Sequence, residues 1–188
     1  TGSITINSGA SYTNSTAVTL SLSATDNVGV VEYYLSTSSS IPTASASGWT
    51  TVTSTTSYSG SVSYTLSGSD GSKTIYVWFK DSGGNISSAA SDSITLDTTV
   101  PTVTISSPTS NSAYTTTSST ISLGGSASDS TSGVTSVTWN NDMGGSGTAS
   151  GTTSWSVSSV SLPGVSNVIT VTATDGAGNT GTDTITVT

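Results

Sequence analysis

The chain has 188 residues and a formal net charge of −8, and 31% of its residues are hydrophobic while only 6% are charged. With two lysines and no arginine it has almost nothing to neutralise phosphates, which argues against nucleic acid and anionic lipid surfaces as partners. It has no histidine and no cysteine, which excludes a histidine-activated nucleophile and any disulfide. No apolar run approaches the ~20 residues of a membrane-spanning helix.

The first half of the chain is predicted to consist of β-strands. Apolar residues alternate with Ser and Thr at the two-residue period of half-buried strands, most clearly from Val18 to Ala24 and from Ile75 to Phe79. No segment has a helical period. The predicted strands cover residues 3–7, 17–24, 29–36, 48–53, 58–66, 73–80 and 86–96.

The second half repeats the landmarks of the first half in the same order. Residues 24–30 match residues 127–134, and residues 80–85 match residues 174–179. The matched segments lie about 100 residues apart along the chain. A repeat of that length is the size of one small β-sandwich. The predicted strands of the second half cover residues 102–106, 119–127, 134–140, 153–160, 167–174 and 180–188.

The boundary between the halves is marked by Pro101, which ends strand pairing and holds Val100 in an extended conformation. The linker is therefore predicted to be short and stiff. We expect two β-sandwich modules, residues 1–97 and residues 98–188. Because residues 1–4 align with the segment that follows Pro101, we also expect the chain to come from a longer array of such modules.

Two tryptophans in the second half are predicted to be core residues. Trp139 alternates with Val137, and Trp155 alternates with Val157, so each tryptophan falls on the apolar face of its predicted strand. A buried tryptophan on the third strand is also a feature of immunoglobulin-type sandwiches.

Five motifs carry a resemblance to a known group of proteins: Pro101–Ile105, Ser132–Trp139, Gly144–Gly147, Asn167–Asn179 and Val77–Asn85. With them the chain resembles bacterial immunoglobulin-like tandem modules. The second half is similar to the modules of glucodextranase-type glycoside hydrolases and of adhesins, and the first half to a bacterial immunoglobulin-like or fibronectin type III module. The resemblance implies an all-β fold of two tandem immunoglobulin-like antiparallel β-sandwiches. It also implies an extracellular or cell-surface protein whose partners are neighbouring modules of the same parent chain.

Acidic and amide residues are predicted to gather at one end of each module. In an immunoglobulin-like strand order, the loop after the second strand, the loop between the last two strands and the N-terminal linker share that end. The two sets are Asp97, Asp129, Asp175 and Asn179 in the second module, and Asp26, Asp81 and Asn85 in the first. One interpretation is turn chemistry alone. The other is a Ca²⁺ site that stiffens the junction, since Ca²⁺ takes ~6–8 oxygen ligands.

An aromatic strip is predicted on the outside of the first module. Alternation along residues 73–80 turns Tyr76 and Trp78 to the outer face, and Tyr34 lies beside them on the neighbouring strand. Exposed aromatic rings on a sheet can stack on sugar rings or anchor a protein partner. The alternative is that Trp49 and the loop around it cover the strip.

The sequence contains no motif of an active site. Glu32 is the only glutamate, and a glycosidase needs two carboxyl groups that flank one bond. Roles in turns and at the surface account for the acidic residues without catalysis. We expect a non-catalytic extracellular module pair, a structural spacer or adhesion segment of a larger secreted or cell-surface protein. The alternative is a carbohydrate-binding accessory module of a polysaccharide-degrading enzyme, with a glycan or a surface protein as partner.

Overall fold

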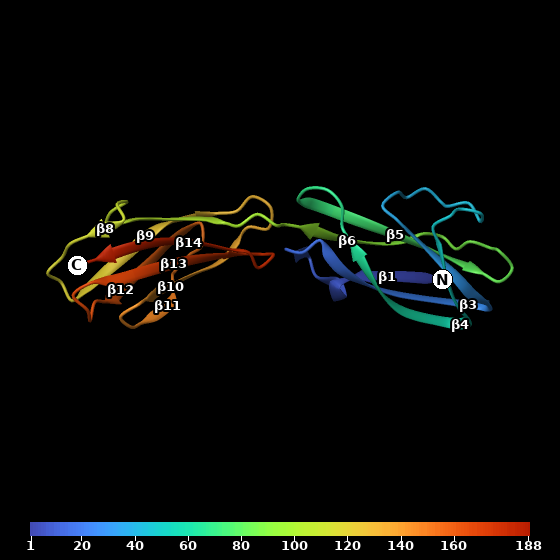
Figure 1. The fold of residues 1–188 in the computed structure, drawn as a ribbon, viewed down its shortest axis with the longest axis horizontal. Coiled ribbons are helices and arrows are strands. Elements are labelled where there is room, and N and C mark those ends of the chain that lie inside the picture. The colour runs from blue at the N-terminus through green and yellow to red at the C-terminus, as the bar shows by residue number, and fades with distance from the viewer. The chain divides into compact units, whose positions relative to one another are not determined.

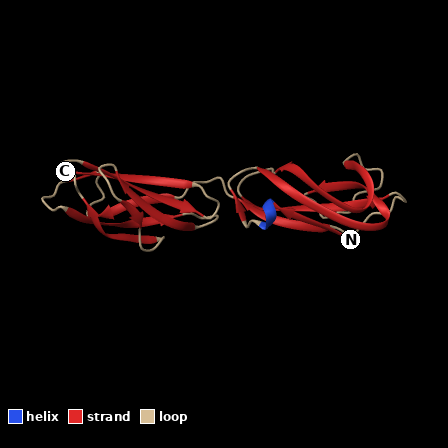
Figure 2. Ribbon diagram, turned by 90° about the horizontal axis from the view of Figure 1, so that it is seen from below, coloured by secondary structure: helices blue, strands red, loops and turns tan.

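The computed structural model describes residues 1–188, and strands dominate it, with a single three-residue 3-10 turn at Asn7–Gly9 (Figure 2). Contacts divide the chain into two compact units, Thr1–Leu96 and Asp97–Thr188, which we call unit 1 and unit 2. Each unit encloses a hydrophobic core of its own. No helix in the structure has the length and apolarity needed to cross a bilayer.

Unit 1 is built around one long, bent strand (Figure 1). Its strands are β1 (Gly2–Ile6), β2 (Tyr12–Thr13), β3 (Ala17–Ser36), β4 (Trp49–Thr65), β5 (Gly71–Asp81) and β6 (Ala90–Leu96). The sheet order is β1-β3-β5-β6-β2, with β4 also paired to β3. The first half of β3 pairs with β1 and the second half pairs with β5, so this strand contributes to both layers of the sandwich.

The structure joins strands that the sequence analysis had separated. Residues 17–24 and 29–36 are one strand, because β4 pairs with β3 from Ala17 to Tyr34 across an irregularity between Thr25 and Val30. Gly29 lies at that irregularity with φ of 115°, a backbone conformation that glycine adopts without strain. The predicted strands at 48–53 and 58–66 are likewise both parts of β4.

Unit 2 has two separate sheets (Figure 1). One sheet has the order β11-β10-β13-β14-β8 and the other has the order β12-β9-β7. The strands are β7 (Thr102–Ser107), β8 (Ala113–Tyr114), β9 (Thr120–Ser128), β10 (Val134–Asn141), β11 (Ser146–Thr148), β12 (Ser154–Ser161), β13 (Asn167–Asp175) and β14 (Thr180–Val187). The short strands β8 and β11, like β2 of unit 1, were not predicted, since two or three residues are too few to show a period.

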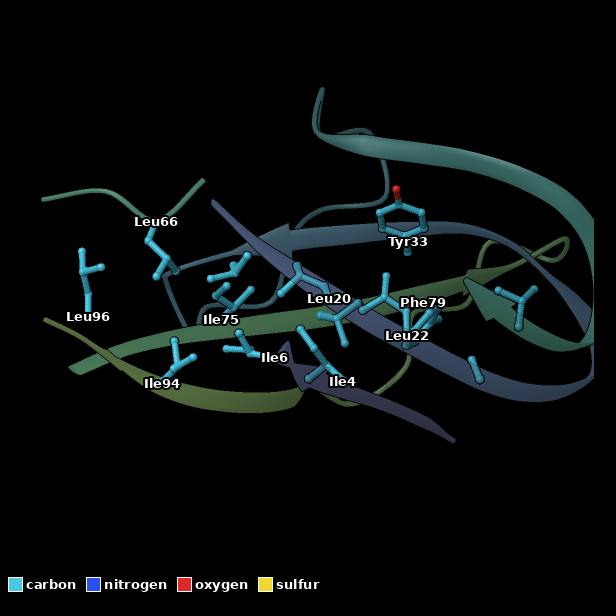
Figure 3. Packing of buried hydrophobic residues seen from close by; sticks show 14 residues of the cluster. Ile4, Ile6, Leu20, Leu22, Tyr33, Leu66, Ile75, Phe79, Ile94 and Leu96 are labelled. Carbon is cyan, nitrogen blue, oxygen red and sulfur yellow. The ribbon is translucent and has the colours of Figure 1, made fainter. Parts of the chain in front are cut away.

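The apolar residues of alternating strands form the two cores. In unit 1, Leu20 and Leu22 of β3 pack with Ile75 of β5, and each is at most 2% exposed (Figure 3). In unit 2, Trp155 is 2% exposed, so its predicted core position is confirmed. Trp139 is only half-buried at the edge of the core, where its ring lies against a loop of glycines around residue 145.

The first residue of unit 2 is Asp97, one residue earlier than the expected boundary. Its side chain is 0% exposed and accepts hydrogen bonds from Thr99 and Ser132, both in unit 2. Leu96, the residue before it, is 1% exposed in the core of unit 1. Leu96 and Asp97 are therefore both buried, and the exposed residues of the connection are 98–100.

Candidate functional site

Three aspartates of unit 2 meet at one end of the sandwich. Asp129 follows the last residue of β9, Asp175 is the last residue of β13, and Asp97 lies ahead of β7. Because β9 and β13 end at the same side of the unit and β7 starts there, these carboxylates are brought together as the sequence predicted. One oxygen from each lies within 4.8 Å of the others.

Asp175 organises the turn between β13 and β14. Its Oδ1 accepts hydrogen bonds from the backbone N–H of Ala177 (2.9 Å) and of Asn179 (2.8 Å). Its Oδ2 accepts one from the side-chain amide of Asn179 (2.8 Å). The same amide donates to the backbone carbonyl of Asp97 (2.8 Å), so Asn179 links the turn to the linker segment. Asp97, Asp175 and Asn179 are thus joined by hydrogen bonds, and a carboxylate oxygen of Asp129 lies within 4.8 Å of those of Asp97 and Asp175.

Asp129 caps the loop between β9 and β10. Its Oδ1 accepts hydrogen bonds from the backbone N–H groups of Thr131, Ser132 and Gly133 at 2.9–3.0 Å. Burial is the largest single influence on the pKa of Asp129 and raises it, but the backbone N–H donors together outweigh burial, so the pKa lies below the ordinary value. Asp129 is therefore a carboxylate at neutral pH.

Ser132 is a member of the site that sequence reasoning did not identify. Its hydroxyl donates to Oδ2 of Asp97 and accepts a hydrogen bond from the backbone N–H of Ala177 (3.2 Å). It thereby joins the linker segment to two loops of the unit. In a chain this rich in serine, no pattern marks one hydroxyl among many, so only the three-dimensional arrangement reveals it.

The charge of this cluster has no counter-charge within unit 2. Both lysines of the chain, Lys73 and Lys80, belong to unit 1. Asp97 and Asp175 are 0% and 2% exposed. Hydrogen bonds from Ser132, Ala177 and Asn179 compensate part of the burial of these carboxylates, and a bound cation would compensate the remaining negative charge.

The donor set of the cluster fits a hard divalent cation. Carboxylate, amide and carbonyl oxygens are the ligands that Ca²⁺ takes, at about 2.3–2.6 Å from the ion. Two oxygens on one such ion are then at most about 5 Å apart, and the three carboxylate oxygens satisfy this limit at 4.8 Å. Asp97, Asp129 and Asp175 would supply the negative ligands, whereas Asn179 turns its amide nitrogen, not its oxygen, toward Asp97 and Asp175.

Unit 1 has a turn at Asp81–Asn85 with the same hydrogen bonds as the turn at Asp175–Asn179 of unit 2. The backbone N–H of Asn85 donates to Oδ1 of Asp81 and its side-chain amide donates to Oδ2, both at 2.8 Å. Oδ1 of Asp26 accepts from the backbone N–H groups of Val28 and Gly29. Asp26, Asp81 and Asn85 line one hollow of about 240 Å³, so the structure brings this predicted set together as well.

Acid is expected to open the turn at Asp81. The amide of Asn85, followed by its backbone N–H, lowers the pKa of Asp81 below the ordinary 3.8. The folded pKa is thus below the unfolded one, so this turn is stabilised at pH above 3.8, and the stabilisation is lost as pH falls through the lower folded value. The shift of the Asn85 side-chain amide in an NMR acid titration should therefore have its midpoint below 3.8. Asn85→Ala should return the Asp81 midpoint to the ordinary range, and a wild-type midpoint at or above that range would contradict this assignment.

The aromatic strip of unit 1 is present but covered, which corrects the expected exposed platform. Trp78 packs with Tyr34 and Tyr76, at ring-centroid distances of 6.2 and 6.1 Å, yet it is only 1% exposed. Trp49 packs edge-on against Tyr34, at 5.5 Å, and Lys80 lies 4.6 Å above the Trp49 ring.

The loop of residues 37–48 and Trp49 form the cover of the strip. The indole N–H of Trp49 donates to the carbonyl of Thr43 (2.9 Å), and Lys80 donates to the carbonyl of Ala44 (3.1 Å). Lys80 also forms the predicted ion pair with Glu32. Tyr34 and Tyr76 are each half-buried. The alternative in which Trp49 and its loop cover the strip is therefore the one that the structure has.

Comparison with known proteins defines the class of fold. No protein-family model and no curated protein matches the chain. Among solved structures it is similar to the fibronectin(III)-like modules of Clostridium thermocellum CbhA, with a TM-score of 0.50 and 16% identity over 98% of this chain and 92% of that one. It is also similar to the D00–D0 domain of intimin, with a TM-score of 0.43 and 12% identity over the full length of both chains.

A further similarity is to a tetra-tandem repeat in the extending region of a large adhesion protein. The TM-score there is 0.35, with 22% identity over 98% of this chain and 48% of that one. At identities this low, the comparisons speak to the fold. The chain is an all-β protein with a sandwich fold like that of fibronectin(III)-like modules, and the all-β sandwich class expected from the sequence is confirmed.

Proposed function

We propose that the chain is a non-catalytic spacer or adhesion segment of a larger secreted or cell-surface protein. The observation that carries this proposal is the passage from Leu96 to Asp97, two consecutive residues that are 1% and 0% exposed in different units. A flexible tether between modules is exposed and rich in Gly or Ser, whereas here the exposed residues 98–100 include neither Gly nor Ser and have a buried residue on each side, Asp97 and Pro101. Such a connection suits a chain whose task is to hold its neighbouring modules at a distance.

The state of the acidic residues supports a role without catalysis. Glu32, the only glutamate, is paired with Lys80 on the neighbouring strand. Asp92 and Asp183 accept hydrogen bonds from the backbone N–H groups of Ile6 and Ile105, both at 2.7 Å, and so hold the first strand of each unit. These carboxylates serve the fold.

Insertion of a flexible segment between Leu96 and Asp97 tests the spacer role. We expect the two units of the native chain to tumble together, so that ¹⁵N relaxation gives both the long correlation time of the whole chain. Four inserted Gly and Ser residues should shorten the correlation time of each unit toward that of a single unit, while each unit keeps its melting temperature. Independent tumbling of the units in the native chain would contradict a spacer with a stiff connection.

We further propose that Ca²⁺ binds at Asp97, Asp129 and Asp175 and makes the segment from Asp97 to Pro101 more rigid. Two buried carboxylates without a cationic partner in the unit support this proposal, together with an oxygen spacing that suits one ion. Isothermal titration of metal-stripped protein with Ca²⁺ should therefore show binding of one ion per chain, which we expect at the cluster in unit 2. An absence of heat and of any change in melting at millimolar Ca²⁺ would leave only the turn-building role for these aspartates.

The carbohydrate-binding alternative has no comparable support. It depended on Tyr34, Tyr76 and Trp78 forming an exposed surface, and the ring of Trp78 is covered. A sugar would have to displace Trp49 and its loop before it could stack on that ring. We therefore propose the spacer role in its place.

A further inference from the structure

The longest edge strand of unit 1 is open along one side (Figure 1). β4 pairs with β3 alone, so the backbone groups on its other side take part in no ladder. From Tyr58 to Thr65 it pairs residue for residue with β3, without an irregularity. A regular and unpaired edge of this kind is a template for one more strand.

The edge strands of unit 2 are short, irregular or covered. β8 has two residues and β11 has three. β12 has an irregular register, and Ser150 bridges its Ser156 through two backbone hydrogen bonds of 2.8 and 2.9 Å. In β7 the N–H of Ile105 is bonded to Asp183. Such features keep an edge from pairing with another molecule, and the stretch Tyr58–Thr65 has none of them.

The two faces of this stretch differ in chemistry. The exposed side chains of the outer face all carry a hydroxyl: Ser59, Ser61, Ser63 and Thr65. The inner face has three larger side chains that are partly buried against the core: Tyr58, Val62 and Tyr64. The whole of β4 contains no charged residue and no proline, the two residue types that most often protect an edge strand.

Paired hydroxyls join neighbouring strands in both units. The hydroxyl oxygens of Ser3 and Ser23 lie 2.8 Å apart, as do those of Thr102 and Ser128. The register continues the row from Ser3 and Ser23 to Ser59 of β4, where the row ends at the open edge. A further strand with hydroxyls at alternate positions would therefore extend a pattern that the protein already uses.

We propose that β4 is a contact between two copies of this chain, in which the stretches Tyr58–Thr65 pair antiparallel about a two-fold axis at Ser61. Such an axis places Ser59 opposite Ser63 of the second copy, and Tyr58 opposite Tyr64 of the second copy. Hydroxyls then face hydroxyls on the outer face, and aromatic rings face each other on the inner face.

The charge of the chain favours a second copy over a charged peptide as the occupant. The net charge is −8, yet neither β4 nor the segment Ala17–Ala24 that pairs with Tyr58–Thr65 carries any of it. Two copies can therefore meet at this edge without placing like charges opposite each other, and a charged peptide finds no counter-charge there. The contact lies on the side of unit 1 and does not depend on the spacer role.

Sedimentation equilibrium of the full chain between about 10 µM and about 1 mM tests this contact. Pairing along one strand buries less than a standard interface, so we expect a weak dimer with a dissociation constant of about 0.1 mM. Ser59→Lys combined with Ser63→Lys would put like charges directly opposite each other and should weaken the dimer by at least about tenfold. The matched control is Ser154→Lys with Ser156→Lys, at exposed positions of β12, and it should dimerise as the wild type does.

A charge reversal tests the antiparallel register. Ser59→Glu with Ser63→Glu should weaken the dimer as the lysines do. An equal mixture of the lysine and glutamate variants should associate at least about tenfold more tightly than either variant alone, because opposite charges then face each other. A wild type that stays monomeric at about 1 mM would overturn the proposal. It would equally be overturned by a lysine variant that dimerises as tightly as its control, or by a mixture no tighter than its components.

Discussion

Replacement of Trp78 by alanine is expected to destabilise unit 1 by about 3–5 kcal/mol, the range found when a large buried aromatic side chain is removed from a core. Trp78 is the largest of the fully buried side chains, at 1% exposure, and its ring contacts both Tyr34 and Tyr76. Alanine would leave these two rings without the partner that they share. At about 4–8 °C per kcal/mol for a domain of this size, the melting temperature of unit 1 should fall by more than about 10 °C.

The measurement is calorimetric melting of the full chain, in which unit 2 serves as the internal reference. Trp78→Phe keeps an aromatic ring and should cost much less than Trp78→Ala. Tyr12→Ala, at a side chain that is 38% exposed, should change the melting temperature little. If Trp78→Ala instead left unit 1 as stable as before and altered only binding to a ligand, the covered position of this ring would be contradicted.

The substitution Asp97→Asn is expected to have opposite effects in chelator and in Ca²⁺. The asparagine has the shape of the aspartate, keeps its Oδ1 for the N–H of Thr99, and can donate from Nδ2 to the Ser132 hydroxyl. In chelator it removes one of three negative charges within 4.8 Å of one another, so unit 2 should become more stable than the wild type.

In Ca²⁺ the order should reverse. Ligand at about 100 times its dissociation constant stabilises the folded state by about 2.7 kcal/mol, and the variant would forfeit most of this because it lacks one negative ligand. Melting of unit 2 in both buffers measures the reversal. Asp142→Asn is the matched control, since it changes the net charge equally at an exposed carboxylate outside the cluster. A variant that is less stable than the wild type by the same amount in both buffers would mean that Asp97 acts only as a hydrogen-bond acceptor.

Most strands were predictable because a strand with one face on a core must alternate, and serine and threonine made the alternation easy to read. The prediction was wrong where a local turn pattern lies inside a strand that pairs with a strand distant in the sequence. Asp26-Asn27-Val28-Gly29 reads as a turn, yet β3 continues through it because β4 supplies pairing on both sides of the irregularity. That pairing partner lies about thirty residues away in the chain, and no local pattern reports it.

The position of the aspartates was predictable for a different reason. Strand order alone fixes which loops share an end of a sandwich, so Asp129, Asp175 and Asp97 could be placed together without any knowledge of side-chain packing. The aromatic strip shows the limit of this reasoning. Alternation correctly predicted the face of the sheet on which Trp78 lies. It could not predict that the loop of residues 37–48 and Trp49 cover that face.

The placement of the two lysines has a consequence for resistance to proteases. Proteases of the trypsin type cut only after lysine or arginine, and both lysines lie within β5, where they are partly buried. Lys80 is also held by Glu32, and Lys73 donates to the carbonyl of Ser69. A folded unit 1 therefore offers such an enzyme no extended loop to cleave. Unit 2, which has neither residue, gives it no bond to cut even when the unit is unfolded.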